Sequence, residues 1–234
     1  MRNKTPISSC VFKNLFREFL PTRVIRRWFK LLGPVARRPP VIKTEELIMC
    51  LVFHVIAGAG TLAQHVKSLT RKSITDGALS QRRQSWPWQL FESLMEGAFG
   101  VKAQEKNHPE AFYQGLRLCG ADGSLLSISN TPQVKKQMRK AKSRRCKAAF
   151  AKVAVAVLLE LGIRNPLAAA IGTRGESEMT LSRQLLDKLP ENSLFMADRY
   201  YGVPVLLIEL KELHPDGHRE FLVHYDREIR LGIL

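Results

Sequence analysis

Acidic residues are scarce in this sequence, in which 21 Asp and Glu stand against 37 Lys and Arg. The formal net charge is therefore +16, and the isoelectric point is near 10.1. A surplus of this size repels itself unless a polyanion is nearby. Nucleic acid, whether DNA or RNA, is thus the first partner to consider, and an anionic membrane surface is the second.

Cysteine is rare as well, and its four copies stand far apart, with no Cys-x-x-Cys pair. Such spacing argues against a zinc finger and indicates thiols in a reducing compartment. Long hydrophobic runs are missing too: the longest, Leu47–Gly60, contains His54 and is shorter than the roughly 20 residues that cross a bilayer. No apolar core of signal-peptide length precedes Pro21. We therefore expect a soluble intracellular protein with no membrane partner.

The first hundred residues have the apolar spacing of short helices, and we expect residues 1–105 to form a helical domain. Thr44 is a suitable N-cap with acidic residues after it, another helix begins at Thr61, and a further one is capped near Asp76. The last of these carries Ser80, Gln81, Arg82 and Arg83. A helix-turn-helix is one interpretation. A plain bundle with solvated arginines is the other, and the pattern favours it.

From Leu116 onward the pattern changes to that of strands. The order of predicted elements is β-β-β-α-β-α-β, which is the ribonuclease-H-like order. We therefore predict an α/β chain, with the helical domain followed by a mixed-sheet core over residues 106–234. The predicted strands are residues 116–121, 153–159, 167–171, 194–197 and 221–225, and the predicted helices are residues 179–189 and 203–212.

Two aspartates fall at the ends of predicted strands, Asp122 after the first strand and Asp198 after the fourth. In a ribonuclease-H-like sheet these strands are parallel neighbours, so both carboxylates would face one crevice. Carboxylates held close together repel, and a hard divalent cation relieves that repulsion. Two-metal phosphodiester chemistry uses such a site. The alternative is two unrelated turn aspartates, because Asp-Gly is a common turn dipeptide.

A strongly basic segment, Lys135–Lys147, follows Asp122, and we predict it as a loop. No Asp or Glu occurs between Asp122 and Glu160, whereas a solvated surface usually mixes both signs. The pattern favours contact with DNA phosphates over a merely solubilising loop. The residues expected to contact DNA are Lys135, Lys136, Arg139, Lys140, Lys142, Arg144, Arg145 and Lys147.

Four short segments resemble those of the DDE-type transposases of the insertion-sequence-four family. Cys119–Ser124 resembles the segment around the first catalytic Asp, and Asn165–Gly172 resembles the second hairpin. Leu194–Tyr201 is similar to the second Asp motif, although Tyr200 replaces a Gly. Ala78–Arg83 resembles the end of the family's N-terminal domain. The resemblance covers most of the chain from about Val24.

The resemblance implies DNA transposition with Mg²⁺, for which Mn²⁺ can substitute. Complete relatives hydrolyse a phosphodiester at each element end, and the freed 3′-OH attacks target DNA. Asp122 and Asp198 would ligate the metal, and the basic segment would hold the DNA backbone. The implied partners are element ends and target DNA, with a homo-oligomer on DNA as an option. The implied location is the bacterial cytoplasm, at the nucleoid when bound to DNA.

The family's third acid is a Glu on a later helix, within a motif of Tyr, Arg, Glu and Lys that this sequence does not contain. Glu228 is the alternative, but its segment directly follows a predicted strand and leaves little room for a helix. A solvated acid among arginines is the favoured interpretation of Glu228. We therefore expect a catalytic domain incomplete at its C-terminal end and a chain that is inactive alone. A non-catalytic DNA-binding remnant or inhibitor, and a stand-alone ribonuclease-H-like nuclease, are the alternatives.

Overall fold

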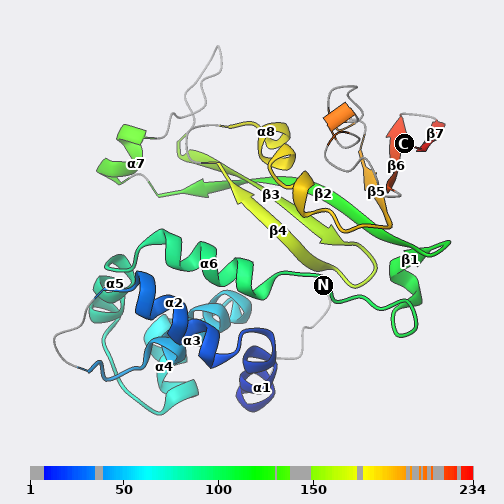
Figure 1. Cartoon of the computed structure of the whole chain (residues 1–234). Coiled ribbons are helices and arrows are strands. Elements are labelled where there is room, and N and C mark those ends of the chain that lie inside the picture. Colours follow the sequence, from blue (N-terminus) through cyan, green and yellow to red (C-terminus); the bar gives the residue numbers. More distant parts are fainter. Residues whose placement is uncertain are drawn as a thin grey trace. The chain divides into compact units, whose positions relative to one another are not determined.

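The computed structural model describes residues 8–34, 39–129, 131–137, 149–172, 176–198, 201, 206, 208–209, 212, 219–225 and 228–233. The chain divides into two compact units, Met1–Ala98 and Phe99–Leu234 (Figure 1). The first unit is helical among its described residues, and the second contains a sheet with helices. This succession confirms the predicted fold class.

The first unit consists of amphipathic helices packed around an aliphatic core. Ile25, Leu47, Val66 and Leu90 are fully buried there. Several helix starts are capped by side chains, as at Thr61, whose Oγ1 accepts from the Gln64 N–H. The helices are α1 (Ser9–Phe19), α2 (Thr22–Leu32), α3 (Thr44–Ala57), α4 (Leu62–Thr70), α5 (Asp76–Gln84) and α6 (Trp88–Ala98).

Two predictions in this unit need correction. Thr44 is the first residue of α3 rather than its N-cap, which is Lys43. The reason is that the Glu46 carboxylate accepts from the Lys43 N–H at 2.8 Å and so defines the helix start one residue earlier. On α5, the Arg82 guanidinium donates to the Ile42 carbonyl and to Thr44, so it supports the fold rather than a solvated face. The helix-turn-helix interpretation of this unit stays an untested alternative.

The second unit is built on one mixed sheet, whose described strands have the order β4-β3-β2-β5-β6-β7, with β1 also paired to β2. Its central pairs, β2–β5 and β5–β6, are parallel, and β2–β3, β3–β4 and β6–β7 are antiparallel. This is the predicted ribonuclease-H-like arrangement. The strands are β1 (Phe112–Tyr113), β2 (Leu116–Ile128), β3 (Ala151–Glu160), β4 (Asn165–Ile171), β5 (Ser193–Ala197), β6 (Arg219–Tyr225) and β7 (Glu228–Ile233).

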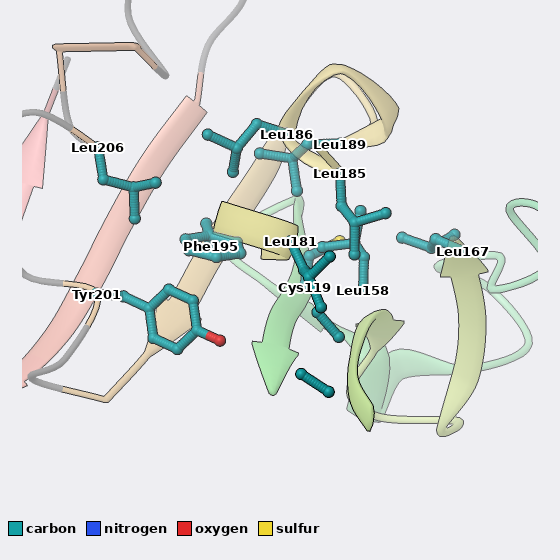
Figure 2. Close-up of a cluster of buried hydrophobic side chains, with 12 residues drawn as sticks. Cys119, Leu158, Leu167, Leu181, Leu185, Leu186, Leu189, Phe195, Tyr201 and Leu206 are labelled. Atoms are coloured by element: carbon teal, nitrogen blue, oxygen red, sulfur yellow. The ribbon is translucent and has the colours of Figure 1, made fainter. Parts of the chain in front are cut away.

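Short helical elements complete this unit, and one of them covers the sheet. The helix α8 (Glu178–Arg183) packs on β2, β3 and β4, and the 3₁₀ turn η2 (Leu186–Lys188) follows it. Their leucines enclose a core with Leu158 and Phe195 from the strands (Figure 2). The remaining elements are the 3₁₀ turn η1 (Pro109–Ala111) and the helix α7 (Pro132–Gln137). The predicted helix over residues 203–212 lies largely outside the described residues, although Leu206, Ile208, Glu209 and Glu212 are helical.

Candidate active site

Asp122 lies within a strand rather than at its end, which corrects the sequence prediction. Strand β2 continues to Ile128, and Asp122 pairs with Val157 of β3. The reason is that the β-branched run of β3 extends the antiparallel pairing, whereas β5 pairs only with residues up to Gly120. Asp122 therefore stands two residues beyond the last β2–β5 pair, at the point where the parallel neighbour stops.

Asp198 follows β5 directly, as the sequence predicts. Asp122 and Asp198 line the same pocket of about 390 Å³, together with Met196, Tyr201 and their neighbours. Both aspartate side chains are exposed to solvent. The structure thus brings the two predicted acids to one concave surface, formed where the parallel strands β2 and β5 separate. This is the site position expected in an open α/β sheet.

Tyr201 forms the buried wall of this pocket and was not singled out from the sequence. Its side chain is 2% exposed, and its N–H donates to the Asp198 carbonyl at 3.1 Å. The Tyr201 hydroxyl donates to Glu178 Oε1 at 2.7 Å and lies 2.9 Å from the Ser182 Oγ. Burial raises the pKa of Tyr201 despite the Ser182 hydrogen bond, and the Glu178 and Asp122 charges add to the rise. The phenol therefore stays protonated and remains a donor.

Glu178, at the start of α8, is the second residue that the sequence analysis missed. Its side chain lies over Gly123, where an added Cβ would be 2.2 Å from the Glu178 Cδ. A glycine inside a strand often marks such a close approach. That signal was available at Asp122-Gly123, but the dipeptide was interpreted as a turn. Because Gly123 adjoins Asp122, Glu178 connects α8 to the strand that carries the first acid.

The basic segment is only partly described. Lys135 and Lys136 lie in the helix α7, which corrects the prediction of a loop, and Lys136 is exposed. Pro132 begins this helix, in the first-turn position that proline favours. The other predicted DNA-contacting residues, Arg139, Lys140, Lys142, Arg144, Arg145 and Lys147, lie outside the described residues.

Glu228 lies in strand β7, opposite Tyr225 of β6. It is therefore not on a helix, in agreement with the expectation that its segment leaves little room for one. Within the described part of the chain, no group of three or more His, Cys, Asp or Glu side chains is arranged to hold a metal ion. In that same part no single helix is long and apolar enough to cross a membrane, although α3 and α4, bent by 120°, would pass together.

No family model matches the sequence. Over 198 residues the chain is 25% identical to "Transposase InsG for insertion sequence element IS4" of Escherichia coli (strain K12), a match that covers 81% of this chain. The chain is thus similar in sequence to an IS4 transposase. This finding confirms the resemblance inferred from the two Asp motifs. The chain spans 44% of the length of that relative.

Solved transposase structures are similar at a lower level. A piggyBac transposase synaptic complex with hairpin DNA gives a TM-score of 0.47 at 10% identity, covering 93% of this chain and 52% of the other. A pre-cleavage Mos1 transpososome gives 0.30 at 14% identity, covering 94% and 74%. These TM-scores are low, so the fold of the chain rests on its own strand order and pairing.

Proposed function

We propose that this chain acts in DNA transposition, binding DNA and holding a divalent cation between Asp122 and Asp198. The observation that carries this proposal is the shared pocket: the two aspartates of the resembling motifs line one concavity beside the parallel strands β2 and β5. The relative named above supplies the reaction class, because its printed name is that of a transposase.

The donor set of the pocket suits a hard cation. Asp122 and Asp198 offer carboxylate oxygens, which are the ligands that the hard cations Mg²⁺ and Mn²⁺ prefer. Softer metals prefer nitrogen or sulfur ligands. Both side chains are exposed, so an ion can reach them without opening the core. When bound, such an ion activates an attacking oxygen or stabilises a leaving oxygen at a phosphodiester. The protein's own part is to hold the two carboxylates in place and to position the DNA backbone.

Charge supports DNA as the partner. The net charge of +16 provides long-range attraction to a polyanion. The eight Lys and Arg of the basic segment follow Asp122 in the chain within a stretch that lacks acids. Contacts between such residues and phosphates fix the position of the duplex without reading its sequence. In this proposal the basic segment binds the backbone, and the acidic pair acts on it.

The test is a Mn²⁺ titration, with DNA binding and cleavage measured on the same preparations. We expect wild-type protein to bind Mn²⁺, and Asp122→Asn and Asp198→Asn each to weaken that binding by at least tenfold, since each removes one of two anionic ligands. Asp187→Asn, an exposed aspartate in η2, is the matched control and should bind as wild type does. Equal Mn²⁺ affinity in all four proteins would refute the metal site. DNA binding without cleavage would assign this chain to DNA binding alone.

A further inference from the structure

We propose that Glu178 and Tyr201 are positioning residues, which together hold the Asp198 segment at its place beside Asp122. This inference rests on the proposed function, because it concerns the same acidic pocket. It adds Glu178, which lies outside the family-like Asp motifs, and a role for Tyr201, the last residue of the second motif. The observations are the hydrogen bonds of the Tyr201 hydroxyl and the packing of Glu178 on Gly123.

The first step concerns Asp198, which follows the end of β5 and has no strand of its own to fix it. The Tyr201 N–H donates to the Asp198 carbonyl at 3.1 Å, so the backbone of Tyr201 is tied to that of Asp198. The Tyr201 side chain is buried next to the core cluster that includes Leu181 and Leu206 (Figure 2). The position of the Asp198 backbone therefore depends on where the Tyr201 ring is held.

The second step concerns what holds the ring. The Tyr201 hydroxyl donates to Glu178 Oε1, so the Ser182 Oγ, at 2.9 Å, acts as the donor to the Tyr201 oxygen. Glu178 and Ser182 are one helical turn apart on α8. The Tyr201 hydroxyl thus both donates and accepts a hydrogen bond, and these two bonds anchor the ring to α8. Losing a partner here would leave a buried polar group unsatisfied.

The third step connects α8 to the other acid. Glu178 lies against Gly123, which is adjacent to Asp122 on β2. The Asp122 Oδ1 accepts from the Gly123 N–H at 2.8 Å, so the orientation of this carboxylate is coupled to the backbone that Glu178 covers. One carboxylate, that of Glu178, therefore contacts both the strand of Asp122 and the turn after Asp198. Residues that support metal-binding carboxylates in this way change metal affinity without touching the ion.

The experiment measures Mn²⁺ affinity and thermal unfolding on the full chain. We expect Tyr201→Phe and Glu178→Ala to raise the Kd for Mn²⁺ by roughly 10- to 100-fold, the usual effect of losing a supporting residue. We expect Glu178→Gln to stay within a few-fold of wild type, because its amide oxygen can still accept from the phenol. Tyr113→Phe and Glu191→Ala, at exposed positions, are the matched controls and should not change the Kd.

Leu181→Val reports on packing alone, because it loosens buried α8 contacts but keeps the three hydrogen-bonding groups. If it weakens Mn²⁺ binding as much as Tyr201→Phe does, the effect is general destabilisation and the inference is wrong. The inference is also wrong if Glu178→Gln weakens Mn²⁺ binding as much as Glu178→Ala does while Tyr201→Phe binds Mn²⁺ as wild type does. Glu178 would then act through its charge. If Asp122→Asn and wild type bind Mn²⁺ equally, the proposed function fails, and this inference fails with it.

Discussion

Glu160 shows how a single buried charge can hold the end of a strand. Its side chain is 0% exposed, yet its oxygens accept from the Lys102 and Ala103 N–H groups at 3.0 and 3.1 Å. Asn165 donates at 2.6 Å, and Arg117 forms an ion pair with it. Each of these donors bonds to a carboxylate oxygen of Glu160. The network fixes β3 to the chain segment that precedes β1.

We predict that Glu160→Gln destabilises the protein by about 3–5 kcal/mol, because it leaves Arg117 without its counter-charge and turns an amide N–H toward other donors. The measurement is the free energy of unfolding from urea titration, monitored in the second unit. The exposed Glu191→Gln is the control and should change it by less than about 0.5 kcal/mol. A loss below 1 kcal/mol for Glu160→Gln would show that the ion pair adds little.

Gly123 offers a second test at this scale. Gly123→Ala places a Cβ within 2.2 Å of Glu178, so the helix side chain must move away, at a cost of about 1–3 kcal/mol. Gly77→Ala is a matched control with the opposite sign, because nothing lies within 4 Å of it in α5, and alanine favours helix by up to about 1 kcal/mol. Urea unfolding of both variants checks the prediction. If both substitutions change the free energy of unfolding equally, the Glu178 side chain moves aside at no energetic cost.

Among the elements, the helix α3 depends on charge at its first turn. Glu46 accepts from the Lys43 N–H at 2.8 Å and pairs with Lys72 at 2.8 Å. Burial opposes ionisation of this group, but the bonds to Lys72 and Lys43 outweigh it and lower the pKa of Glu46 below 4.5. A lowered folded-state pKa gives stability that is present above about pH 4.5 and lost as the pH falls through the lowered value.

We therefore predict that Glu46→Gln weakens the first unit at pH 7 and makes less difference at pH 3. The reason is that the Glu46 carboxyl of the unfolded state takes up a proton below about pH 4.5, which removes stability that the lowered folded-state pKa provides. Urea unfolding of both proteins at the two pH values gives the difference directly. A gap between wild type and variant that stays constant from pH 7 to pH 3 would show that the Glu46 charge contributes nothing.

The types of the main strands followed from the sequence, whereas their ends and the helix α7 did not. The apolar run at Val153–Leu159 and the short run before Asp198 were sufficient to predict β3 and β5, since hydrophobic periodicity is local. The parallel pairing of β2 with β5 was predicted from the order of the elements. The extent of β2 past Asp122 was missed because it depends on pairing with β3, which is a distant segment. Glu178 and Tyr201 were missed for the same reason: their contact joins residues 23 positions apart.

At the scale of the whole molecule, the positive charge exceeds what the ion pairs of the fold neutralise. Ion pairs such as Arg26–Glu45 and Arg183–Glu209 engage a few cations, but the surplus of +16 remains. Exposed basic residues occur in the first unit, and Lys136 of the basic segment in the second unit is exposed as well. Both are therefore candidates for the DNA-binding surface, and salt dependence can separate them, because each phosphate neutralised by a cation releases counterions.

We predict that DNA affinity falls linearly with salt on a log–log plot, with a slope of about −0.9 per phosphate contacted. Replacing Lys136, Lys140, Lys142 and Lys147 by Gln should flatten this slope by about 3.6 units if each contacts one phosphate. The matched control replaces four exposed cations of the first unit, Arg23, Lys30, Lys67 and Arg83, and removes the same charge. Because both quadruple variants lose four positive charges, a general electrostatic effect lowers the DNA affinity of both equally. Only substitutions in the surface that contacts DNA change the slope by the larger amount.

Fluorescence anisotropy on a duplex between about 50 and 200 mM salt measures this slope. A slope that flattens only in the control would move the DNA-binding surface to the helical unit.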